Sequence, residues 1–258
     1  MTSTKSYATF RVALNLSLAA LWLVANPTRS EAYAPLSEYA SETSAGFSVL
    51  VHRDVDADAE LATKTRRELK RQLTEIVKVL PEHALVELRK VQIWVELNAK
   101  ERGGAEYHVS RRWLTENGYN PAKTGGVEIA NARNFVEWSA AAQPCMVLHE
   151  LAHAWHFRVL GEDHAEIAAA YRNAMDRGLY DRVPYVAGGT QKAYATTNDK
   201  EYFAELSEAY YGKNDFFPFV RRELEKHDPQ GFAAIRATWE APVESRAEES
   251  ATAEPAGQ

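Results

Sequence analysis

Three residues in the segment HELAHAWH, which runs from His149 to His156, have the types and spacing of a metal site. Residues four apart lie on one face of an α-helix, about 6 Å from each other, so His149 and His153 could both direct an imidazole at one ion. Glu150 would lie at the edge of that face, where its carboxylate could reach a water molecule on the ion without binding the ion itself. This H-E-x-x-H pattern is typical of zinc sites that activate water.

The third histidine of the segment, His156, does not fit the same ion. It lies seven residues after His149, which places it about 10 Å further along the helix axis at 1.5 Å per residue. We therefore expect His156 to pack in the core or to support a ligand. Val159 stands where the metzincin pattern H-E-x-x-H-x-x-G-x-x-H has its third histidine, and this excludes that class.

A third ligand must come from elsewhere, since a catalytic zinc usually has three protein ligands and one open position. The helix expected after Asn198 carries Glu201, Glu205 and Glu208 on one stripe, and spacing alone does not choose between Glu201 and Glu205. Glu201 also lies three residues after Asn198, so it could instead complete a capping box. We expect Cys145, four residues before His149, to be a small buried thiol.

HELAH, followed about fifty residues later by NDKEYFAE, resembles the gluzincin metallopeptidases, above all the peptidase domain of anthrax toxin lethal factor and its relatives. The resemblance covers two short blocks, 149–153 and 194–205, and Asp199 departs from the glutamate often found at its position. It implies that Glu201 is the third zinc ligand and that Tyr194 polarises the substrate carbonyl. It also implies that Glu205 orients a zinc-bound histidine, and the segment VEIANA (127–132) resembles the edge strand above zincin clefts.

These observations predict a peptidase that binds one Zn²⁺ ion through His149, His153 and Glu201, with Glu150 as general base. A peptide or protein substrate would pair with VEIANA, and Tyr194 would help to stabilise the oxyanion. Two alternatives stay open: a non-catalytic zinc-binding envelope protein of the same fold, and a metal-free envelope protein in which HELAH is accidental. A structural zinc site is disfavoured because such sites commonly use several cysteines and this chain has one.

Composition and the N-terminal sequence indicate which partners and which location we expect for the protein. A formal charge of −6 gives no basic surface for nucleic acid, and one cysteine excludes an internal disulfide. Lys5 and Arg11 precede an apolar stretch, 12–25, that is shorter than the roughly 20 residues of a membrane span. We therefore expect residues 1–32 to be a cleaved signal peptide, or an anchor if retained, and the mature protein to be an exported monomer without a membrane span.

Hydrophobic periodicity predicts an α+β, zincin-like fold in which a small N-terminal mixed sheet packs on a mainly helical C-terminal half. Residues 33–45 are expected to form a linker, 46–240 one catalytic domain and 241–258 a disordered tail. The stretch 106–120 is expected to be irregular. The expected strands are 47–51, 90–97 and 127–132, and the expected helices are 57–80, 144–160, 165–177, 198–212, 216–227 and 229–239.

Overall fold

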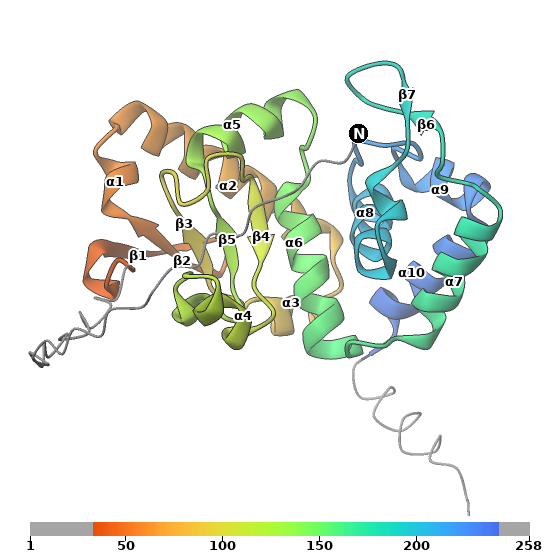
Figure 1. Ribbon diagram of the computed structural model, residues 1–258, viewed down its shortest axis with the longest axis horizontal. Helices are drawn as coiled ribbons and strands as arrows, with labels where there is room; N and C mark the ends of the chain where they lie inside the picture. The colour runs from red at the N-terminus through yellow and green to blue at the C-terminus, as the bar shows by residue number, and fades with distance from the viewer. Residues whose placement is uncertain (1–32, 243–258) are drawn as a thin grey trace, which may run out of the picture. The chain divides into compact units, whose positions relative to one another are not determined.

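The protein has an α+β fold with a mixed five-stranded sheet in its N-terminal half, as the sequence predicts (Figure 1). The computed structural model describes residues 33–242, so the expected signal peptide and nearly all of the expected tail lie outside the described residues. The strands are β1 (Tyr39–Ser44), β2 (Phe47–His52), β3 (Ile93–Val95), β4 (Ala105–Tyr107) and β5 (Val127–Ile129). Their order is β1-β2-β3-β5-β4, in which β2, β3 and β5 are parallel and both edge strands are antiparallel.

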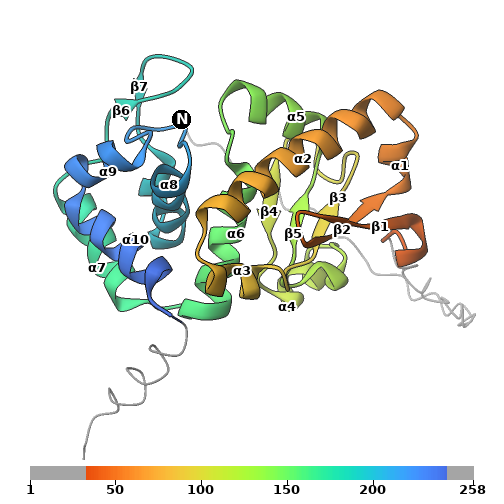
Figure 2. The same ribbon diagram turned by 180° about the vertical axis from the view of Figure 1, so that it is seen from behind.

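One face of this sheet forms the apolar core together with the helices that follow it. Alternate side chains of β2, β3 and β5 are fully buried on that face, as the two-residue period of a strand requires. Helix α2 (Ala59–Val79) begins at Asp58, whose carboxylate accepts a hydrogen bond from the Leu61 backbone, and runs across the sheet (Figure 2). Helices α1 (Arg53–Asp56), α3 (Glu82–Leu88) and α5 (Ala132–Ala141) also belong to this half.

The other face of the sheet carries buried charges instead of an apolar core. Lys123, at the end of the short helix η2 (Pro121–Lys123), donates hydrogen bonds of 2.6 Å to both Glu96 and Glu128. Glu128 also accepts one of 2.6 Å from His108, which directly follows β4. Burial would raise the pKa of Glu128, but its contacts with His108 and Lys123 outweigh that effect and lower it. This charged cluster thus joins β3, β4, β5 and η2, and η2 packs against α4 (Arg111–Glu116).

The C-terminal half is built from helices that pack around stacked aromatic rings. These helices are α6 (Met146–Trp155), α7 (Ala165–Asp176), α8 (Asp199–Tyr211), α9 (Arg221–His227) and α10 (Pro229–Glu240). The Trp239 ring stacks on Trp155 of α6 and on Phe203 of α8, at centroid distances of 5.1 and 5.8 Å. Because this stack joins α6, α8 and α10, it fixes how the helix bearing HELAH lies against the helix bearing Glu201.

The structure corrects several details of the sequence prediction. Residues 33–45 are not all linker, because η1 (Leu36–Glu38) is followed by β1, which pairs along its full length with β2. VEIANA is not an edge strand: β5 lies between β3 and β4, and β4 occupies the edge, with two of its three residues in the stretch 106–120 that was expected to be irregular. The helix expected over 144–160 begins at Met146 and changes to a π-helical turn at His156–Leu160. Within residues 33–242, none of the helices combines the length and apolar character needed to cross a membrane.

Candidate metal centre

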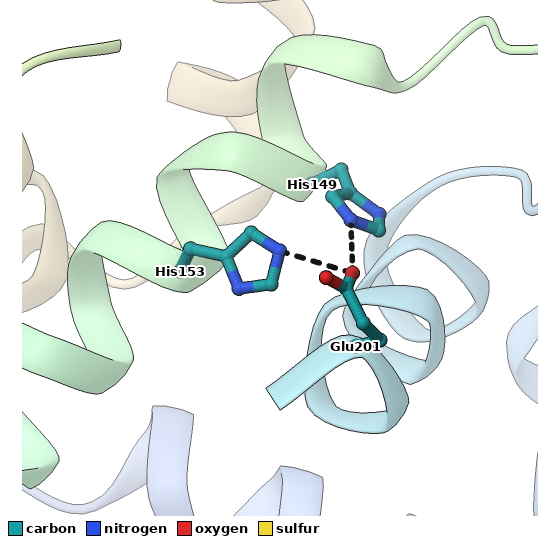
Figure 3. A group of neighbouring side chains, drawn as sticks. All are labelled: His149, His153 and Glu201. Carbon is teal, nitrogen blue, oxygen red and sulfur yellow. Dashed lines mark hydrogen bonds and ion pairs between the residues drawn. The ribbon is translucent and has the colours of Figure 1, made fainter. Parts of the chain in front are cut away.

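The two histidines of HELAH face helix α8 across the largest helix–helix packing contact of the C-terminal half. Helix α8 begins at Asn198, whose side-chain oxygen accepts hydrogen bonds from the backbone N–H groups of Lys200 and Glu201, at 2.9 and 2.8 Å. This cap places Glu201 in the first turn of α8. The Glu201 carboxylate does not turn back onto the cap; it points at the two imidazoles (Figure 3).

One carboxylate oxygen of Glu201 lies close to both rings. Its Oε2 atom is 3.1 Å from Nε2 of His149 and 3.2 Å from Nε2 of His153. In a tetrahedral zinc site with bonds of 2.0–2.1 Å, neighbouring ligand atoms lie about 3.3 Å apart. The three side chains form a group whose ligand atoms all lie within 4.8 Å of one another. Their spacing and chemistry therefore fit a single zinc-like ion.

The charges of this group favour a cation. Burial would raise the pKa of Glu201, but its hydrogen bonds with His149 and His153 hold that pKa far below its ordinary value. Burial would likewise lower the pKa of His149, yet the carboxylates of Glu201 and Glu208 raise it well above its ordinary value. A site that draws a proton so strongly onto an imidazole will also attract a metal ion in place of that proton.

The carboxylate that orients His149 is Glu208, not Glu205 as the resemblance implies. Nδ1 of His149 lies 2.8 Å from Oε1 of Glu208 and 4.0 Å from Oε1 of Glu205, so only Glu208 is within hydrogen-bond range. A partner on Nδ1 fixes the ring and leaves Nε2 for the ion. The sequence placed Glu208 on the right stripe, two helical turns after Glu201, but did not single it out.

Acidic side chains are concentrated around His149, on the side of its Nδ1 atom. Burial, followed by the nearby charges of Glu208 and Asp215, raises the pKa of Glu205 well above its ordinary value. Burial raises the pKa of Glu208 to about 7, against the opposing effect of His149. Burial also raises the pKa of Asp215. These three carboxyl groups are thus held in a poorly solvated environment where their full ionisation is disfavoured.

Glu150 and Tyr194 lie in the wall of one cavity of about 780 Å³ that also contains the three candidate ligands. Glu150 is only 8% exposed, one residue beyond His149 on α6. Tyr194 belongs to the short helix η4 (Tyr194–Thr196), and its ring centroid lies 6.3 Å from that of His149. Burial and the Glu201 carboxylate raise the pKa of Tyr194, so its hydroxyl keeps its proton at neutral pH. The cavity therefore has a carboxylate acceptor and a hydroxyl donor beside the candidate ligands.

The edge strand β4 forms the opposite wall of this cavity. Ala105, Glu106 and Tyr107 all line it, and β4 packs against α6. The pairs 104/130 and 108/126 are joined by backbone hydrogen bonds across β4 and β5. Alternation along an antiparallel strand then turns the N–H and C=O groups of Ala105 and Tyr107 toward the open edge. An extended chain could pair with those groups.

His156 and Cys145 do not belong to this group of ligands. His156 is fully buried, neither of its ring nitrogens has a hydrogen-bond partner, and burial lowers its pKa to about 4. It packs against the ring of Phe203, so it is a core residue. The Cys145 thiol is partly buried and accepts a hydrogen bond from the Lys213 backbone at 3.3 Å.

Comparison with protein-family models, with curated proteins and with solved structures finds no match for this chain. The arrangement of the side chains is therefore the basis for assigning a function.

Proposed function

We propose that this protein is a zinc-dependent peptidase of the gluzincin type. The observation that carries the proposal is the meeting of His149, His153 and Glu201 at one point in the wall of a cavity that also contains Glu150. Two imidazoles and a carboxylate are the ligand set of a catalytic zinc that keeps an open position. A structural site would close its coordination with a fourth protein ligand, and the triad has no such ligand in the group found among residues 33–242.

Zn²⁺ is the ion that this ligand set favours, although imidazole and carboxylate ligands also accept Co²⁺, Mn²⁺ or Fe²⁺. When bound, the ion would act as a Lewis acid on a water molecule and on the scissile carbonyl. Glu208 would hold His149 in the tautomer that presents Nε2 to the ion.

The remaining chemistry belongs to side chains of the cavity. The Glu150 carboxylate accepts a proton from the water as the new C–O bond forms, and it then delivers a proton to the amide nitrogen as the C–N bond breaks. The products are a carboxylate and an amine. The Tyr194 hydroxyl donates a hydrogen bond to the oxyanion that develops on the carbonyl oxygen, an effect worth a few kcal/mol in related sites. Tyr194 is 49% exposed, so its ring is free to adjust to a substrate.

The substrate is a peptide or protein segment in extended conformation. We place it on the open edge of β4, since β5 is already paired on both sides. Ala105 and Tyr107 offer the backbone groups for this pairing, which would lay the scissile bond between β4 and the candidate ligands. We further propose that the protein is exported and acts as a monomer, in keeping with the signal sequence expected at its N-terminus.

The test separates metal binding from catalysis. Purified protein is expected to contain about one zinc per chain by elemental analysis, and to digest a proteome-derived peptide library in a reaction that a chelator stops. Glu150→Gln is expected to keep the zinc and to lose nearly all turnover, since the amide cannot accept the proton. Full activity of this variant would refute the mechanism.

Two other results would each identify an alternative. Bound zinc without cleavage of any peptide would identify a non-catalytic zinc-binding protein. A zinc content near zero, with no uptake of added zinc, would show that the HELAH sequence is accidental.

A further inference from the structure

Three acidic side chains form a group in the cavity wall beside the candidate ligands. Glu205, Glu208 and Asp215 all line the cavity and are only 3%, 4% and 5% exposed. Nδ1 of His149 lies 2.8 Å from Oε1 of Glu208 and 4.0 Å from Oε1 of Glu205, and Asp215 lines the same cavity. The group is therefore near the N-terminal end of α6.

Within the described part of the chain, the only ion-pair partner of this acidic group is the His149 imidazole, which gives up its proton when it binds a metal ion. Oε2 of Glu205 is buried and has no hydrogen-bond partner. Among residues 33–242, no lysine or arginine forms an ion pair with Glu205, Glu208 or Asp215. Buried carboxylates are almost always paired, because removal of the charge from water is otherwise costly. The open cavity is thus the direction from which a positive charge can arrive.

The direction of β4 shows which part of a bound peptide would reach the group. At the start of β4, a Cβ added to Gly104 would lie 3.1 Å from the Trp138 ring and 3.2 Å from Sδ of Met146, the first residue of α6. At its end, Tyr107 stacks on Phe157, which follows α6. Strand β4 and helix α6 therefore run in the same direction.

A peptide paired antiparallel with β4, the more stable arrangement per residue, runs the opposite way. Its residues after the scissile bond would then lie toward Met146 and the acidic group. Met146 and Phe216 also line the cavity and offer apolar surface to the methylene groups of a long side chain.

We propose that the acidic group formed by Glu205, Glu208 and Asp215 is a subsite that binds the lysine or arginine side chain of the substrate residue directly after the scissile bond. The inference rests on the proposed peptidase function and adds a substrate class to it.

The first experiment identifies the residue that follows each cut in a peptide library. The wild-type protein is expected to enrich lysine and arginine at that position. A matched pair of peptides, one with lysine and one with the uncharged norleucine there, is then expected to differ by at least about tenfold in kcat/KM. Cleavage without enrichment of basic residues would overturn the inference and leave the peptidase function intact.

Variants then locate the subsite. Asp215→Asn and Glu205→Gln keep the size of each side chain, and each is expected to reduce the preference for lysine over norleucine several-fold. The double variant is expected to abolish the preference for lysine while it keeps its zinc. Glu162→Gln, at an exposed residue outside the cavity, is the control and should keep the full preference. An unchanged preference in the double variant would overturn the inference.

A binding measurement separates this inference from the peptidase function. Zinc-loaded Glu150→Gln protein is expected to bind the lysine peptide at least about tenfold more tightly than the norleucine peptide, by fluorescence anisotropy. Equal affinities would overturn the inference even if other peptides are cleaved. If no peptide is cleaved, the peptidase function fails, but a preference for lysine in binding would still support the subsite. Two zinc ions per chain, with one lost in Asp215→Asn, would instead assign the acidic group to a second metal and overturn the inference.

Discussion

Replacement of Glu208 by glutamine tests how the candidate centre holds its ion. Oε1 of Glu208 lies 2.8 Å from Nδ1 of His149 and the side chain is 4% exposed, so the carboxylate is a close and poorly solvated partner of that ring. Glutamine keeps the size of the side chain and an oxygen that can accept the Nδ1 hydrogen, but it removes the negative charge. The charge makes the imidazole a stronger ligand and fixes its tautomer.

Loss of such a partner typically weakens metal binding about 10- to 100-fold, which corresponds to about 1.4–2.7 kcal/mol. We expect a change of this size in the zinc dissociation constant of Glu208→Gln, measured at pH 8, above the pKa of about 7 of Glu208, by competition with a chromophoric chelator. Circular dichroism and thermal unfolding of the apo-protein would show that the variant is folded.

Glu205→Gln is the matched control on the same helix. Its Oε1 is 4.0 Å from Nδ1 of His149, beyond hydrogen-bond range, so we expect its zinc affinity to change by less than about threefold. If Glu205→Gln loses zinc and Glu208→Gln does not, the assignment of the orienting role to Glu208 is wrong.

Three further predictions concern protons and packing. Because the pKa of His149 is raised well above 6.5, this ring is protonated at pH 7 before zinc binds; zinc binding should release a proton and strengthen as pH rises. Calorimetry in buffers of different ionisation enthalpy measures that proton, and a heat independent of buffer would contradict the prediction. The pKa of His156 falls from 6.5 to about 4 on folding. Between these pH values the unfolded chain therefore binds one proton more than the folded chain. The free energy of unfolding should fall by about 3 kcal/mol as the pH drops from 6.5 to 4. His156→Leu should remove this part of the pH dependence in urea unfolding; an unchanged pH profile would count against it. Gly231→Ala should destabilise the protein by about 1–3 kcal/mol, because its Cβ would overlap Tyr202, Asp228 and Leu206; an unchanged urea midpoint would exclude this overlap.

The sequence predicted the helices of the site well because their signals are local. HELAH lies in an apolar helical pattern, and Asn198 caps the helix that follows the long loop. These two patterns were enough to bring His149, His153 and Glu201 into consideration together. The choice between Glu201 and Glu205 could not come from spacing, since it depends on how α8 is rotated against α6.

The errors arose where structure depends on contacts between distant segments. Strand β1 has no buried residue, so it lacks the alternation that marks a strand, and its extended form comes from pairing with β2. Strand β4 has only three residues and follows a glycine pair, so it carries little signal of its own. The preference of His149 for Glu208 over Glu205 likewise follows from the packing of two helices, which spacing within α8 does not encode.

The charged cluster beneath the sheet has a consequence for how this protein can vary. Lys123, Glu96, Glu128 and His108 are joined by hydrogen bonds to one another and are all at least nine-tenths buried. A neutral residue at one of these positions would leave a buried charge without its partner. This would lower the free energy of unfolding by about 3–5 kcal/mol. Descendants of this chain should therefore exchange the four residues together or keep all of them. The edge strand β4, on which we place the substrate, would then be held in position by a set of residues that evolves together.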